Sequence, residues 1–164
     1  MMISKSMNAK LNAQVTAEFS AAHTYLSMSC AFDGMGLRIL AKRFRSQYTE
    51  ELEHGIKIVD YVQEVGGAVT LEAVPQPVAE YADAEALVSA ALNSEQHITR
   101  LINDLVALAD KEKDYATRSF LTWFVDEQVE EIASMSALLD LVRLADGNML
   151  QVENRVRHEM SPQG

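Results

Sequence analysis

The chain has 164 residues, 48% of them apolar, which is typical of one folded domain with a substantial core. Acidic residues outnumber basic ones by 24 to 14, and this net charge of −10 argues against a nucleic-acid partner or an anionic membrane, since Lys and Arg bind phosphates. The single cysteine, Cys30, excludes an intrachain disulfide, and no apolar run approaches the roughly 20 residues that cross a bilayer. We therefore expect a cytoplasmic protein.

Long stretches rich in Ala, Leu, Glu, Gln, Lys and Met predict an all-α fold, because these residues favour helix and Gly and Pro are confined to a few breaks. Asp83 is expected to cap the third helix, and Gly147 to close the fourth in a left-handed turn. In chain order, the predicted helices span residues 6–32, 37–65, 83–109, 114–145 and 149–159.

The connections between these helices predict how they pack. Short links make the first two helices antiparallel neighbours, and likewise the third and fourth. The linker 66–81 is too long for a hairpin, but at about 3.3 Å per residue it can cross the length of a bundle. The prediction is one domain over residues 1–164, a four-helix bundle with one long crossover and a short fifth helix.

Each long helix carries a glutamate where its apolar stripe should face the core. No Lys or Arg lies midway along the same stripes, and an unpaired buried charge costs several kcal/mol. Mid-helix positions of an antiparallel bundle meet at one level, so these acids would be buried together. Either a multivalent cation binds them, which we favour, or they stay protonated in a polar, water-filled core. The four residues are Glu18, Glu51, Glu95 and Glu131.

The spacing of Glu51 and His54 supports the metal interpretation. Residues three apart on a helix project to one side, so a carboxylate and an imidazole can reach one ion. Oxygen ligands with one nitrogen suit Fe²⁺ in a redox site, and Zn²⁺ and Mn²⁺ also fit such a set. The sequence has no group of cysteines that would favour structural zinc.

Four segments together resemble the prokaryotic non-haem ferritins, over nearly the whole chain. They are EFSAAHTY at 18–25, EELEH at 50–54, EQ at 95–96 and WFVDEQVEE at 123–131. The resemblance implies a homo-oligomeric shell, a 24-mer, that oxidises Fe²⁺ with O₂ and stores ferric mineral inside. Iron and oxygen would be the substrates of this ferroxidase.

The resemblance also implies roles for single residues. Glu18 and His54 would bind the first iron, and Glu51 would bridge the two irons of the pair. Glu95 would bind the second iron, with Gln128 nearby.

Further residues would surround this di-iron site. Tyr25 would lie beside it as a hydrogen-bond donor or one-electron partner. Glu131 would reach toward a third iron position, which Glu50, Glu127 and Glu130 would complete. The last three could instead form an ordinary solvated face.

Some features depart from related families. Bacterioferritins have a haem-binding Met where this chain has Leu52, and a second Glu-x-x-His where it has 128–131, so we expect no haem. Cys30 is expected to be a small buried residue, and Trp123 to serve packing. Two other functions stay open: a mineral-storing cage without a working ferroxidase site, and a small di-iron oxidase or peroxidase.

Overall fold

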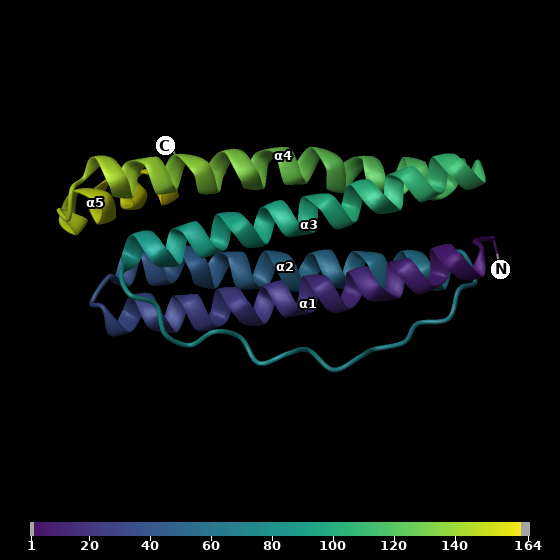
Figure 1. Cartoon of the computed structure of the whole chain (residues 1–164), viewed down its shortest axis with the longest axis horizontal. Helices are drawn as coiled ribbons and strands as arrows, with labels where there is room; N and C mark the ends of the chain where they lie inside the picture. Colours follow the sequence, from purple (N-terminus) through teal and green to yellow (C-terminus); the bar gives the residue numbers. More distant parts are fainter. Residues whose placement is uncertain (1, 162–164) are drawn as a thin grey trace.

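The computed structural model describes residues 2–161, and they form a bundle of long helices closed at one end by a short one (Figure 1). The predicted all-α fold is confirmed, and each helix begins and ends within three residues of its predicted bounds. In chain order the helices are α1 (Lys5–Gly34), α2 (Arg38–Glu64), α3 (Ala84–Glu112), α4 (Tyr115–Leu144) and α5 (Met149–Met160).

Local sequence sets several helix ends. Asp83 caps α3, since its Oδ1 accepts a 2.8 Å hydrogen bond from the Ala86 amide, as predicted. Beyond the end of α4, Asp146 and Gly147 both have positive φ, at 45° and 83°, which confirms the left-handed turn predicted there.

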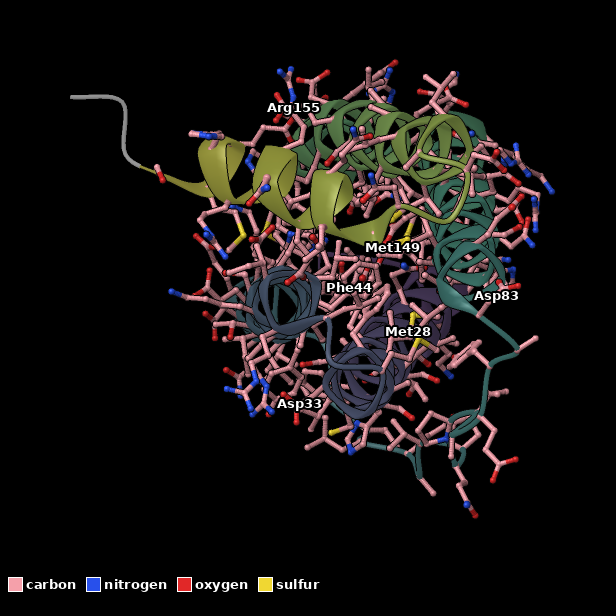
Figure 2. The ribbon with its side chains drawn as sticks, turned by 90° about the vertical axis from the view of Figure 1, so that its left-hand side faces the viewer. Met28, Asp33, Phe44, Asp83, Met149 and Arg155 are labelled. Carbon is pink, nitrogen blue, oxygen red and sulfur yellow. The ribbon has the colours of Figure 1, made fainter. Side chains whose placement is uncertain are left out.

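The N-terminus of α2 is capped by a distant residue rather than by its own flank. Leu37, at the cap position, makes no side-chain hydrogen bond. Instead Glu153 of α5 accepts 2.8 Å hydrogen bonds from the amides of Ile39 and Leu40. This contact fixes α5 across the end of the bundle, as Figure 2 shows in the view along the helices.

The connection between α2 and α3 crosses the bundle beside α1 (Figure 1). It contains neither helix nor strand in the described chain, and two asparagines of α1 hold its first part. Asn8 accepts from the Ala68 amide at 2.9 Å, and Asn12 accepts from the Thr70 amide at 2.6 Å. Asn12 also donates to the Ala68 carbonyl at 2.9 Å. Side-chain amides thus replace the partner strand that an extended segment would otherwise need.

The apolar core consists of two clusters separated by a polar layer. On α2, Phe44 belongs to the cluster near α5 and Ile58 to the cluster at the opposite end. On α3 the same division falls between Ala91 and Ile98. Because the helices are antiparallel, the segments between the clusters meet at one level. Those of α2, α3 and α4 contain Glu51, Glu95 and Glu131, and Glu18 of α1 lies beside them.

Helices α1 and α2 approach closely at Gly55, next to this layer. A Cβ atom at position 55 would lie 2.4 Å from Cε1 of Phe19, which is much closer than van der Waals contact. Phe19 directly follows Glu18, and Gly55 directly follows His54. Because Gly55 has no side chain, α1 and α2 can come close together beside Glu18 and His54.

We expect Gly55→Ala to destabilise the fold. The substitution gains up to about 1 kcal/mol of helix propensity, but forcing Phe19 aside costs about 1–3 kcal/mol of overpacking. The predicted result is a lower melting temperature in a thermal denaturation scan. Gly34→Ala is the control, because a Cβ atom there meets nothing within 4 Å. A higher melting temperature for Gly55→Ala than for Gly34→Ala would contradict the close approach.

Candidate metal centre

The predicted glutamates all lie inside the bundle. Glu18 of α1, Glu51 of α2, Glu95 of α3 and Glu131 of α4 are between 0% and 6% exposed. His54, one turn after Glu51, is 6% exposed. The buried residues of the described chain include no Lys or Arg, so neither of these basic side chains compensates the carboxylates.

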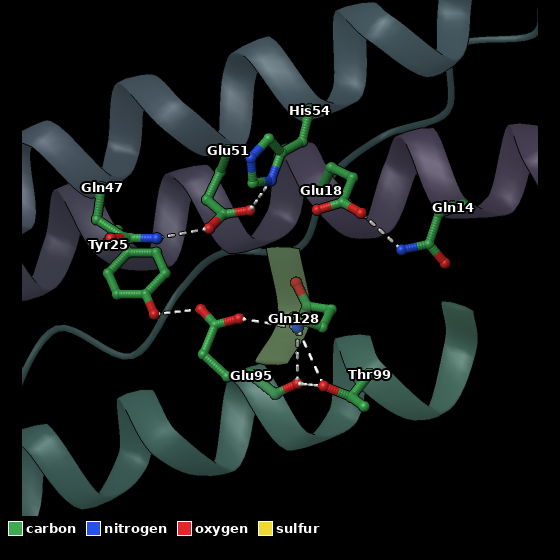
Figure 3. A network of polar contacts seen from close by, with 9 residues as sticks. All are labelled: Gln14, Glu18, Tyr25, Gln47, Glu51, His54, Glu95, Thr99 and Gln128. Carbon is green, nitrogen blue, oxygen red and sulfur yellow. Dashed lines mark hydrogen bonds and ion pairs between the residues drawn. The ribbon is translucent and has the colours of Figure 1, made fainter. Parts of the chain in front are cut away.

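Three of these residues converge on one point. Ligand atoms of Glu18, Glu51 and His54 lie within 4.8 Å of one another, and Figure 3 shows them pointing together from α1 and α2. His54 Nδ1 lies 3.2 Å from Glu51 Oε2. Glu18 Oε1 accepts a 2.7 Å hydrogen bond from Gln14, but Glu18 Oε2 is buried without a partner. A bare carboxylate oxygen beside a second carboxylate and an imidazole suits a divalent cation.

Glu95 lies across from this group, on α3 (Figure 3). Its carboxylate accepts hydrogen bonds from the Tyr25 hydroxyl and from Gln128 Nε2, the latter at 3.3 Å. Gln128 also donates to Thr99 Oγ1 at 3.1 Å. Tyr25 and Gln128 therefore hold Glu95 in place from two other helices.

A second group of acids lines an open pocket of about 410 Å³ between α2 and α4. Glu131 is the buried member of this group. Gln47, which also lines the pocket, donates a 3.0 Å hydrogen bond to Glu51, so the pocket adjoins the buried group. We call it the acidic pocket. Its acids are the four expected around a third iron position, namely Glu50, Glu127, Glu130 and Glu131.

Comparisons with known proteins agree with this arrangement. The family model of the ferritin-like domain matches residues 8–145. The chain belongs to the ferritin family.

The chain is similar to bacterial and archaeal ferritins. It is 38% identical over 146 residues to the bacterial non-heme ferritin of Staphylococcus haemolyticus, covering 88% of each chain. It is 31% identical to ferritin BfrB of Mycolicibacterium smegmatis over 157 residues, 96% of this chain and 87% of the relative. Among solved structures, an open pore ferritin from Archaeoglobus fulgidus superposes with a TM-score of 0.92 at 39% identity, covering 94% of this chain and 96% of the other. The resemblance inferred from the sequence is confirmed.

Burial and mutual repulsion alter the titration of the centre. Burial raises the pKa of Glu18 well above its usual range, and the charge of Glu51 adds to the effect. Burial likewise raises the pKa of Glu95 to about 7 and that of Glu131 to about 8. Burial acts to lower the pKa of His54, but its hydrogen bond and attraction to Glu51 outweigh this and raise it to about 9. Without a cation, the centre therefore holds protons near neutral pH, and a bound cation would displace them.

Two residues of this network are not evident from the sequence. Gln14 is 2% exposed and supports Glu18, and Thr99 accepts from Gln128. Both lie four residues, about one helical turn, from a predicted ligand, and this spacing is the only pattern that could have indicated them.

Other residues that the sequence brought to attention are not ligands of the centre. His23 and His97 are exposed. The expectation that Cys30 is buried is wrong: it is exposed, because its position on α1 points away from both apolar clusters. Trp123 packs edge-on against His54 with ring centres 5.3 Å apart, and Lys57 Nζ lies 3.9 Å from the centre of the Trp123 ring.

No helix of the described residues is both long and apolar enough to cross a membrane.

We expect the metal-free protein to lose stability as pH rises from about 5 to about 9. The folded-state pKa values of Glu95, Glu131 and His54 lie above their ordinary values, so the folded state binds more protons than the unfolded state in this range. Stability is therefore greatest at the acidic end and falls as each group loses its proton. Thermal unfolding at several pH values measures this fall.

Glu131→Gln should reduce the fall, since a neutral amide cannot titrate, and Glu112→Gln at an exposed position should not. Saturating Zn²⁺ should also reduce it, because the cation replaces the protons. Identical pH profiles for Glu131→Gln and the unaltered protein would contradict this assignment of the buried charges.

Proposed function

We propose that this chain is an iron-storage ferritin whose bundle centre oxidises Fe²⁺ with O₂. The observation that carries the proposal is the buried group of Glu18, Glu51 and His54, in which one carboxylate oxygen has no partner. Three buried ligands without a compensating Lys or Arg favour a cation as the missing partner. Membership of the ferritin family makes iron the expected cation.

The positions of the side chains support a role for each. Glu18 and His54 hold the first Fe²⁺, and Glu51, which lies between His54 and the facing α3, bridges to the second. Glu95 holds the second Fe²⁺, with Gln128 fixing its carboxylate. Carboxylates suit these positions because they can change between terminal and bridging binding as the ion changes charge.

The chemistry transfers two electrons from two Fe²⁺ ions to O₂, with two protons completing hydrogen peroxide. Glu95 and His54 hold protons in the metal-free centre and would release them when iron binds, which offsets the two protons that the reaction consumes. Tyr25 donates a hydrogen bond to Glu95 and lies beside the pair, which suits either a positioning role or a one-electron role. The side chains exclude water from the reacting ions, because none of these groups is more than 6% exposed.

Two further parts of the proposal concern iron beyond the centre. Glu50, Glu127, Glu130 and Glu131 bind a third iron in the acidic pocket, through which ions pass between the centre and the surface formed by α2 and α4. The mineral then accumulates inside a shell of 24 copies, without haem. Leu52 stands where the resemblance to bacterioferritins would put a haem-binding Met, and this supports the proposed absence of haem.

Glu51→Ala should abolish the fast phase of iron oxidation. Removing a residue that only orients a metal ligand slows a metalloenzyme by roughly 10- to 100-fold. Loss of the bridging carboxylate itself should slow iron oxidation by at least this much. Stopped-flow absorbance after mixing the metal-free protein with Fe²⁺ in aerated buffer measures the rate. Glu53→Ala is the matched control, because it removes an exposed carboxylate from the same helix.

An unchanged rate in Glu51→Ala would refute oxidation at the bundle centre. A slow rate in the unaltered protein, equal to that of Glu51→Ala, would favour the alternative of a storage cage without a working ferroxidase site.

The shell is tested by size. Gel filtration with light scattering should give a particle of 24 copies of the 18.2 kDa chain. A particle of one or two chains would exclude storage in a shell and favour a small di-iron oxidase or peroxidase.

A further inference from the structure

The acidic pocket has a single basic residue in its wall. Of the nine lining residues, four are glutamates and one, Arg43 of α2, is positively charged. The buried centre contains no such residue, since Lys and Arg are missing from the buried positions of the described chain. The two neighbouring cation sites therefore differ in that only one includes a fixed positive charge.

Two other helices hold Arg43 at the edge of the pocket. Its Nη2 donates a 2.8 Å hydrogen bond to Ser134 Oγ of α4, and its Nη1 lies 3.7 Å from Glu159 Oε2 of α5. The other oxygen of Glu159 accepts from Arg155 at 2.9 Å. The Arg43 side chain is only 20% exposed, so these contacts fix the guanidinium rather than leaving it free in solvent.

The charge of Arg43 acts on the glutamates of the pocket. Burial lowers the pKa of Arg43, while attraction to Glu159, Glu131 and Glu50 opposes this effect, and a guanidinium stays charged at neutral pH. Glu131 and Glu50 attract the positive charge of Arg43. The same charge must repel any cation that these carboxylates bind. A guanidinium has no lone pair to offer, so Arg43 cannot itself be a ligand.

We propose that Arg43 sets how tightly the acidic pocket holds a cation. Ser134 and Glu159 keep its guanidinium at the edge, where it weakens cation binding without occupying the place of the ion. Four carboxylates alone would retain iron strongly, whereas the added positive charge lets the ion leave. The inference rests on the proposed function, in which this pocket passes iron to and from the centre.

The test measures cation binding to the metal-free protein rather than oxidation. Tb³⁺ is the probe, because it prefers oxygen ligands and its luminescence reports binding directly. Sites that disappear in the double variant Glu127→Gln/Glu130→Gln belong to the pocket. Arg43→Gln should bind Tb³⁺ there at least about fivefold more tightly, since one repelling charge is removed.

Arg45→Gln is the matched control for this variant. It removes the same charge two residues away on α2, at an exposed position that lines a different pocket. At about 0.15 M salt, screening limits the influence of such a distant surface charge, so its affinity should stay within about twofold of the unaltered protein.

Glu159→Gln tests the part of the inference that concerns α5. Without its ionic partner, Arg43 should turn toward the pocket glutamates and weaken Tb³⁺ binding by about twofold or more. In the Arg43→Gln background the same substitution should have little further effect, because its action passes through Arg43. If Arg43→Gln does not fold, Glu159→Gln alone decides, and unaltered affinity overturns the proposal.

The outcomes separate this inference from the proposed function. Equal Tb³⁺ affinity in Arg43→Gln and Arg45→Gln overturns the role of Arg43 and leaves oxidation at the centre untouched. Tb³⁺ binding that the Glu127→Gln/Glu130→Gln variant does not alter overturns both the third iron site and this inference. Failure of oxidation at the centre appears only in the Glu51→Ala experiment.

Discussion

The burial of several carboxylates with no Lys or Arg beside them is the constraint on which the structure depends. Each long helix of the bundle contributes a glutamate to the polar layer, and among the described residues the only buried cationic partner is His54. Protons can satisfy part of this charge, since the pKa values of Glu95 and Glu131 are raised, but Glu18 still has an oxygen without a partner. Apolar packing on both sides must therefore supply the free energy that holds the layer together.

The two apolar clusters serve this purpose from opposite ends. One is closed by α5, whose Glu153 caps α2, and the other by the segment that Asn8 and Asn12 hold against α1. The close approach at Gly55 then fixes α1 against α2 beside the layer. Rigid apolar ends and a polar middle give a site whose ligands come from separate helices but keep fixed positions.

Charge distinguishes the two candidate cation sites that share this bundle. The buried centre has one nitrogen ligand and contains no Lys or Arg among its described buried residues. The acidic pocket is open, offers carboxylate oxygens as ligands and includes Arg43 in its wall. Tight binding suits the site where iron reacts, and weaker binding suits a site through which iron passes. Helix α5 takes part in this difference, because Glu159 pairs with Arg43.

The sequence by itself determined the helices, the topology and the glutamates of the centre, because helix propensity and the spacing of apolar residues are local properties that Glu18, Glu51, Glu95 and Glu131 visibly interrupt. It also indicated His54, which shares one helix with Glu51. Only the tertiary structure placed Gln14 and Thr99 in the network, exposed Cys30, and joined Arg43 to Ser134 and Glu159. Those contacts depend on the rotation of each helix and on the position of α5, which are set by packing between segments far apart in the chain.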